Sequence, residues 1–497
     1  MQSLLRLSTL FLIVLCTGIV SLRSTLAAGS SGSRQGPYLL QQLQKLSAGN
    51  WARVAGLDTG LPPRVNGHDE FAAAWTKEIM KSLHGLHVGV YHQTFHTPGF
   101  RELPASKPGS NVVVTVPGSQ DPGHAVVLVA HYDGEPFSKG SAFDDASGCV
   151  VMLGVAKELG ALWRSKGRPA LSVEFVLFDA EEQGLVGSSA FAFDLHHGAI
   201  MPRPVVVVDE EQSGIGYPAR PFGLLSNDPF PSYAVVGEPI PSFISRYIGH
   251  ITPWKPSAIK QLTNRLMTDR GSAFQRLHAV YSPLSFRGGS TPAFSNEEEY
   301  FLEIGPVSEC CSDNIPFDVL GIPTATFVGN GDFYSSKPKD WSYPFDQPGD
   351  TLTAMACDTG GSPQPLPALG AALDLPRVLS VDLVGQYAPA RRGKTSLSVF
   401  SSLPQAGDAM EFSVAGGGKA MWSFGDGSHA TGTSATHTFK RPGSYTVTVR
   451  AGSAATSVKL SVPGQQPPYK NSFPIPLAPP RIRPWNPTEL QNIAGCH

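Results

Sequence analysis

Acidic and imidazole side chains end three apolar segments of the sequence, within residues 131–211. The chemically relevant residues are His131, Asp133, Asp144, Glu181, Glu182 and Asp209. Two divalent ions that share a site need about five protein ligands, one of them a bridging carboxylate, and a free carboxylate to take a proton from water. The adjacent pair Glu181-Glu182 can supply both a base and a ligand, because neighbouring side chains diverge at the end of an extended strand.

Each of these groups also has a purely structural explanation when it is taken alone. A His-x-Asp sequence is common in surface loops, Asp144-Asp145 can cap a helix, and a Glu pair after a strand is usually solvated. Charged residues are only 16% of this chain, however, against about 25% in an average globular protein. The concentration of these residues at strand and helix ends therefore favours a metal site.

The elements that must position these residues alternate in type. The segments 125–131, 173–180 and 204–209 are apolar and rich in β-branched residues, which is typical of strands covered on both faces. The segment 149–162 has apolar residues at helical spacing and lies between the first two strands. This order predicts an α/β three-layer sandwich with a mostly parallel central sheet. Ligands bind at the carboxyl ends of such strands, where the candidate residues lie.

The three strings VLVAHYDG, SAFDDASG and VEFVLFDAEEQG, within residues 127–184, resemble the co-catalytic di-zinc aminopeptidase family. This family includes secreted bacterial leucyl aminopeptidases and relatives of glutamate carboxypeptidase. The resemblance is strong over residues 125–209 and weaker over about 37–390.

The resemblance implies a role for each matching residue. His131 and Asp209 would bind one zinc ion, Glu182 would bind the other, and Asp144 would bridge the two. Glu181 would be the general base, and Asp133 would orient His131. Two zinc ions are therefore expected.

One position departs from the family pattern. The last ligand of the family is a histidine four residues before an Asp-Thr pair, and here Asp346 stands four residues before Asp350-Thr351. The segment between His278 and His429 contains no histidine that could take its place. We expect Asp346 to replace the histidine as a ligand; the alternative is a weakened or empty second site, since an oxygen-only ligand set suits harder ions better than zinc.

The N-terminal segment predicts export from the cytoplasm. Arg6 precedes sixteen uncharged residues, and small residues follow near Ala27-Ala28. This pattern is typical of a secretory signal peptide over residues 1–28, and no later segment is expected to span a membrane. The formal net charge of −2 offers no basic field for nucleic acid.

The remaining sequence divides into three further parts. The metallo-aminopeptidase-like domain is expected over residues 29–390, with an insertion at about 215–300. The pattern WSFGDG…HTF…PGSYTVTV resembles a polycystic-kidney-disease (PKD) domain, which predicts an immunoglobulin-like β-sandwich over residues 391–463 with Trp422 in its core. A proline-rich tail follows over residues 464–497.

The favoured function is that of a secreted, zinc-dependent aminopeptidase acting on peptide or protein substrates. A single-zinc acyltransferase that cyclises N-terminal glutamine, as glutaminyl cyclases do, is one alternative on the same scaffold. A catalytically impaired binding protein is the other. Retention of Glu181 beside four ligand positions counts against the last alternative.

Overall fold

The computed structural model describes residues 35–47, 67–95, 109–135, 138, 140–214, 232–237, 303–307, 312–329, 350–359, 365–394, 396–403 and 405–464. Three predicted parts of the chain fall wholly or largely outside these ranges: the signal peptide, most of the 215–300 insertion and the proline-rich tail. Asp346 also lies outside the described residues.

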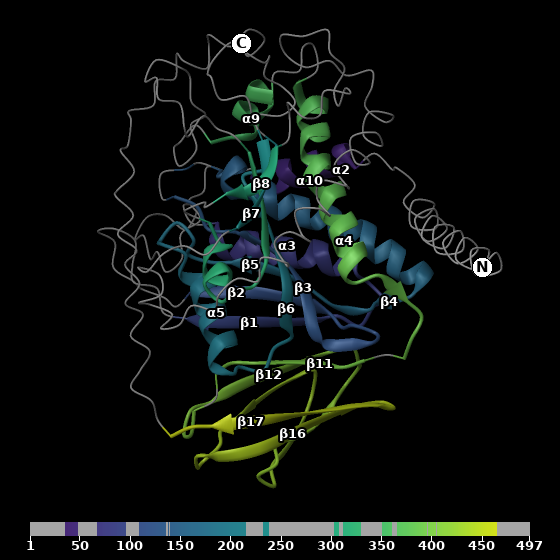
Figure 1. Cartoon of the computed structure of the whole chain (residues 1–497), viewed down its shortest axis with the longest axis vertical. Coiled ribbons are helices and arrows are strands. Elements are labelled where there is room, and N and C mark those ends of the chain that lie inside the picture. Colours follow the sequence, from purple (N-terminus) through teal and green to yellow (C-terminus); the bar gives the residue numbers. More distant parts are fainter. Residues whose placement is uncertain are drawn as a thin grey trace, which may run out of the picture. The chain divides into compact units, whose positions relative to one another are not determined.

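The described residues of the larger domain form an eight-stranded sheet in the order β1-β2-β5-β3-β6-β9-β7-β8 (Figure 1). The strands are β1 (Gly89–Phe95), β2 (Gly109–Val116), β3 (Asp121–His131), β5 (Leu171–Phe178), β6 (Arg203–Glu211), β7 (Ser232–Gly237), β8 (Glu303–Val307) and β9 (Thr324–Gly329). The central strands β5, β3, β6 and β9 are parallel, whereas β1 and β2 add an antiparallel edge.

Helices cover both faces of this sheet (Figure 1). The helices are α2 (Gly36–Leu46), α3 (His68–Ser82), α4 (Ser147–Lys166), α5 (Val186–His197), α8 (Ile315–Val319), α9 (Leu352–Thr359) and α10 (Pro365–Tyr387). Alternate strand residues such as Leu128 and Phe175 pack with α2, α3, α4, α9 and α10 in one core. Their neighbours Val127 and Val176 pack with Phe191 of α5 and Phe317 of α8 on the opposite face. This alternation follows from the two-residue period of a strand.

Helix α4 connects β3 to β5 and begins directly after the short helical turn η1 (Ala142–Ala146). It ends at Gly167, whose positive φ of 115° suits a residue without a Cβ. Helix α4 is long and apolar enough to cross a membrane, but 78% of its most apolar stretch is buried inside the protein. It is therefore the central core helix of the domain.

The C-terminal strands form two antiparallel sheets, β11-β12-β15 and β14-β13-β16-β17. Their bounds are β11 (Ser398–Ser401), β12 (Met410–Ala415), β13 (Met421–Ser423), β14 (His429–Thr431), β15 (Ser434–His437), β16 (Gly443–Ala451) and β17 (Ala454–Val462). Trp422 is 1% exposed and its Nε1–H donates to Gly432 O at 2.9 Å, so it is a core residue as predicted. The short strands β4 (Arg168–Pro169) and β10 (Ala390–Arg391) pair with each other.

The predicted fold class is confirmed: a mixed α/β sheet covered by helices, followed by an all-β antiparallel sandwich. The predicted strands and helix are all present. β3, β6 and α4 extend beyond the predicted segments, whereas β5 begins two residues earlier than predicted and ends at Phe178, two residues before the predicted end.

The start of α4 depends on one residue without a side chain. A Cβ at Gly148 would lie 1.5 Å from Glu210 O, at the end of β6. We expect Gly148→Ala to lower the free energy of unfolding by about 3 kcal/mol or more, because backbone atoms cannot yield to the new methyl group. Urea unfolding followed by tryptophan fluorescence measures this change.

Gly385, in the last turn of α10, is the matched control. A Cβ there would meet nothing within 4 Å. Gly385→Ala should leave the free energy of unfolding within about 1 kcal/mol of the wild-type value. Equal stability of the two variants would contradict the close packing of α4 on β6.

Candidate active site

The carboxyl ends of β3, β5 and β6 bring the predicted residues to one edge of the sheet. His131 is the last residue of β3, and Phe178, its register partner, is the last residue of β5. Glu181 and Glu182 follow shortly after that strand. Because the central strands are parallel, their ends meet at the same side of the domain.

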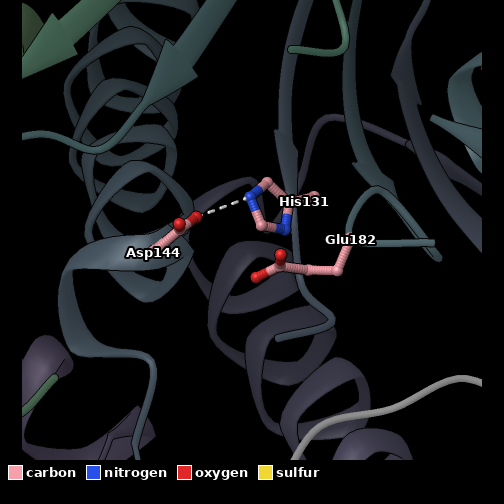
Figure 2. A group of neighbouring side chains, drawn as sticks. All are labelled: His131, Asp144 and Glu182. Atoms are coloured by element: carbon pink, nitrogen blue, oxygen red, sulfur yellow. Dashed lines mark hydrogen bonds and ion pairs between the residues drawn. The ribbon is translucent and has the colours of Figure 1, made fainter. Parts of the chain in front are cut away.

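Three of the predicted ligands form a compact group (Figure 2). Ligand atoms of His131, Asp144 and Glu182 lie within 4.8 Å of one another. His131 Nε2 is 3.0 Å from Asp144 Oδ1. Figure 2 shows the carboxylate of Glu182 directed toward the space between the other two side chains. One imidazole and two carboxylates make a donor set that suits a zinc ion.

Asp133 joins two strand ends through its carboxylate. Its Oδ1 lies 3.3 Å from His131 Nδ1 and accepts the backbone N–H of Glu181 at 3.0 Å. Its Oδ2 accepts the backbone N–H of Glu182 at 3.2 Å. These contacts orient the imidazole ring, so that Nε2 faces the group, and also fix the backbone of the Glu181-Glu182 pair.

The carboxylate of Glu181 lies beside the same group. Its Oε2 is 4.0 Å from His131 Nε2, and the residue is 9% exposed. Burial raises the pKa of Glu181; the charge of His131 opposes this shift, and the charge of Glu211 adds to it. A carboxylate with a raised pKa is a stronger proton acceptor, as a general base requires.

Glu211 is a site residue that the sequence analysis missed. Its Oε2 lies 3.7 Å from His131 Nε2, and it forms a second compact group with His131 and Asp145. In the parallel register of β3 and β6, Val129 stands beside Asp209. Two residues farther along each strand, His131 therefore lies level with Glu211.

Asp209, the ligand expected from this strand, lies in neither of the two groups among the described residues. Its Oδ2 accepts Ser312 Oγ at 2.8 Å and the backbone N–H of Asn314 at 3.0 Å. The same Ser312 hydroxyl lies 3.0 Å from Glu211 Oε2. The strand register therefore sets Asp209 beside Val129, two residues before the level of His131 and Glu211. Its role as a ligand stays a prediction.

The turn that carries Asp144 is fixed by two further carboxylates. The oxygens of the buried Asp350 accept the backbone N–H groups of Phe143 and Asp144 at 2.8 and 3.1 Å. Asp145 Oδ1 accepts the backbone N–H of Gly148 at 2.9 Å, at the start of α4. Asp145 Oδ2 is buried without a hydrogen-bond partner among the described residues. A buried carboxylate oxygen of this kind suits a cation ligand.

The charge of the site favours a cation. Burial alone would lower the pKa of His131, but the charges of Glu211 and Glu181 and hydrogen bonds to Asp133 and Asp144 raise it well above 6.5. Burial, and then the charge of Glu211, raises the pKa of Asp145 in turn. Several carboxylates thus share a low-dielectric space, and a divalent cation would neutralise them.

A buried ion pair supports the segment before Glu181. His68 Nε2, from α3, is 2.7 Å from Asp179 Oδ1. Asp179 Oδ2 also accepts the backbone N–H of Ser110 at 2.7 Å. Burial would lower the pKa of His68, but the charge and hydrogen bond of Asp179 and a hydrogen bond to Asp69 raise it to about 10. The pair ties α3 to the end of β5.

Comparison with known proteins agrees with this geometry. Residues 111–227 match the sequence profile of Peptidase family M28, and residues 396–463 match that of the PKD domain. A probable zinc metalloprotease of Pyricularia oryzae is 34% identical over 134 residues, which are 24% of this chain and 25% of that protein. Aminopeptidase YwaD of Bacillus subtilis is 44% identical over 66 residues, 13% of each chain. The matched stretches thus span a quarter or less of these relatives.

Among solved structures, BSAP, a zinc aminopeptidase from Bacillus subtilis, aligns with a TM-score of 0.43 at 13% identity. The alignment covers 72% of this chain and 97% of that one. The family match covers the stretch of chain that carries His131, Asp144, Glu181, Glu182 and Glu211. Residues 111–227 thus resemble peptidase family M28, and residues 396–463 resemble a PKD domain.

The His68–Asp179 pair gives a prediction about stability and pH. We expect His68→Gln to lower the free energy of unfolding by about 3 kcal/mol at pH 6.5, because it leaves Asp179 buried without its cation. The pKa of His68 is raised in the folded state, so its contribution is fully present below pH 6.5 and is lost as the pH rises through about 10. The difference between wild type and variant should therefore shrink between pH 7 and pH 10.5.

Urea unfolding across this pH range measures the effect, with His124→Gln as the control. The His124–Asp121 pair has the same 2.7 Å separation, but its side chains are 49% and 47% exposed. Exposed pairs contribute about 1 kcal/mol or less. A cost for His68→Gln no larger than that for His124→Gln, or a cost that does not change with pH, would refute the assignment.

Proposed function

We propose that the chain is a secreted, zinc-dependent peptidase that releases residues from the N-terminus of peptides or proteins. The observation that carries this proposal is the arrangement of His131, Asp144 and Glu182 within 4.8 Å of one another, with the Glu181 carboxylate 4.0 Å from His131. The family match and the aminopeptidase among the relatives support the reaction type. The signal-like N-terminal segment supports secretion.

We assign the metal ligands to His131, Asp144, Glu182 and Glu211. Glu211 takes the place that we expected Asp209 to hold, because the strand register sets Glu211 level with His131. Asp209 then orients Ser312 and the backbone of Asn314. Asp133 orients His131 and does not itself face the group.

The residues of the chain divide the reaction among them. When bound, zinc polarises the peptide carbonyl and makes a water molecule more acidic. Glu181 accepts a proton from the attacking water while the water oxygen bonds to the carbonyl carbon. Glu181 then returns the proton to the leaving amine when the C–N bond breaks. Asp133 keeps Glu181 in place because its carboxylate accepts the backbone N–H of Glu181.

Replacement of the base tests this function. We expect Glu181→Gln to lower kcat for an aminoacyl arylamide by about 10²- to 10⁴-fold, because an amide cannot accept the proton. A chelator should abolish wild-type activity, and added zinc should restore it. The variant should keep the zinc content of the wild type, as measured by mass spectrometry.

Glu174→Gln is the matched control for this substitution. Glu174 is a fully buried residue of β5 with a pKa of about 8, raised by burial, so it is largely neutral at pH 7 and an amide replaces it closely. The activity of the Glu174→Gln variant should stay within about threefold of the wild-type activity. Chelator-insensitive hydrolysis, or release of cyclised product from an N-terminal glutaminyl peptide without hydrolysis, would contradict the peptidase proposal. The latter result would support the glutaminyl-cyclase-like alternative.

A second pair of variants tests the assignment of Glu211. We expect Glu211→Gln to weaken zinc binding by about 100-fold or more, since a neutral amide replaces a ligand, and Asp209→Asn to weaken it by about tenfold. Competition with a chromophoric chelator measures both constants. The reverse order of the two effects would return the ligand role to Asp209.

A further inference from the structure

One side chain near the proposed metal site has no part in the reaction described above. Gln212 directly follows β6, and its Nε2–H donates to Asp144 Oδ2 at 2.9 Å. The other carboxylate oxygen, Asp144 Oδ1, is the one that faces His131 Nε2. The two oxygens of Asp144 are therefore divided between His131 and Gln212.

The backbone holds Gln212 firmly in this position. Gln212 has a positive φ of 47°, which is uncommon for a residue other than glycine. Its N–H donates to Asp145 Oδ1 at 3.1 Å, and the next N–H, of Ser213, donates to Ser147 Oγ at 2.7 Å. Both acceptors lie beside the turn that carries Asp144. The backbone of residues 212–213 is thus tied to the same segment as the carboxylate that its side chain contacts.

The chemistry of the contact bears on how many ions Asp144 can hold. A carboxylate that bridges two ions offers one oxygen to each. The amide nitrogen of Gln212 is a donor without a lone pair for a cation, and it occupies Asp144 Oδ2. Rotation of the amide would place Gln212 Oε1 against that oxygen, and two oxygens in contact repel each other unless a cation lies between them.

We propose that Gln212 takes the place of a second ion on Asp144, so that this chain holds one zinc ion tightly and a second only weakly. The tightly held ion is the one that the His131 side of the site binds, where Asp144 Oδ1 and Glu211 Oε2 lie 3.0 and 3.7 Å from His131 Nε2. The inference rests on the proposed metal site and assigns to Gln212 the weakening of the second of the two expected zinc sites. Peptide hydrolysis needs only one ion with an open position, so the proposed reaction is unaffected.

Zinc titration of chelator-treated protein tests the proposal. Isothermal titration should show one tight site in the wild type and a second site at least about 100-fold weaker. Gln212→Met removes the amide donor at similar volume and should tighten the second site by about tenfold or more. Gln212→Glu replaces the donor with an oxygen ligand and should tighten it further. Circular dichroism checks that both variants fold.

The chain offers a matched control in Gln93, on β1. Its Nε2–H donates to Asp194 Oδ2 at 2.6 Å, which is the same kind of contact in a partly buried place outside the site. Gln93→Met should bind zinc as the wild type does. The competing explanation for a weak second site is that Asp346 stands where the family pattern has a histidine. Asp346→His, which restores that histidine, tests this explanation.

Each outcome has a defined meaning. Tightening of the second site by both Gln212 variants, but not by Gln93→Met, supports the proposal. Two equally tight ions in the wild type overturn it, as does a second site that Asp346→His tightens and Gln212→Met leaves unchanged. A wild type that binds no zinc and hydrolyses no substrate would instead defeat the proposed function, so the two failures are distinguishable.

Discussion

The carboxylate of Asp133 is the contact on which the arrangement of the site depends. It orients the ring of His131 at the end of β3 and accepts the backbone N–H groups of Glu181 and Glu182 after β5. One buried side chain thereby sets the position of two proposed ligands, His131 and Glu182, and of the proposed base, Glu181. Because each group is held by an interaction with the same carboxylate, a small movement of Asp133 would displace all three together.

The rest of the domain keeps mutually repelling groups close together. Carboxylates at the ends of β3, β5 and β6 and in the turn before α4 lie in a buried space, and burial raises the pKa of Glu181, Asp145 and Asp209. Contacts with the backbone offset part of the free-energy cost of this repulsion. Asp350 binds the turn before α4, and Gly148 lets the helix approach β6 to a distance that no other residue would permit. The stability of the scaffold and the affinity for a cation are therefore linked, since both depend on the same carboxylates.

The predicted elements and the candidate site differ in how well the sequence anticipated them. Apolar runs rich in β-branched residues gave the central strands, and the His-x-Asp and Glu-Glu pairs gave the groups around His131, because these signals are local. No local signal, however, tells which of the two carboxylates of β6, Asp209 or Glu211, lies beside His131. Both face the same side of β6, and only the register of β6 against β3 sets Glu211 level with His131. The same holds for His68 and Gln212, whose partners Asp179 and Asp144 lie 111 and 68 positions away in the sequence.

By itself the sequence determined the fold class, the PKD domain, and the residue types at the ends of the parallel strands, because strand period, turn residues and motif spacing are properties of short segments. Only the tertiary structure decided which of those side chains meet. The strand register brought Glu211 to His131, and the left-handed backbone at Gln212 turned an amide toward Asp144. Contacts of this kind depend on where several distant segments pack to within a few ångströms, and no local pattern of residue types encodes that.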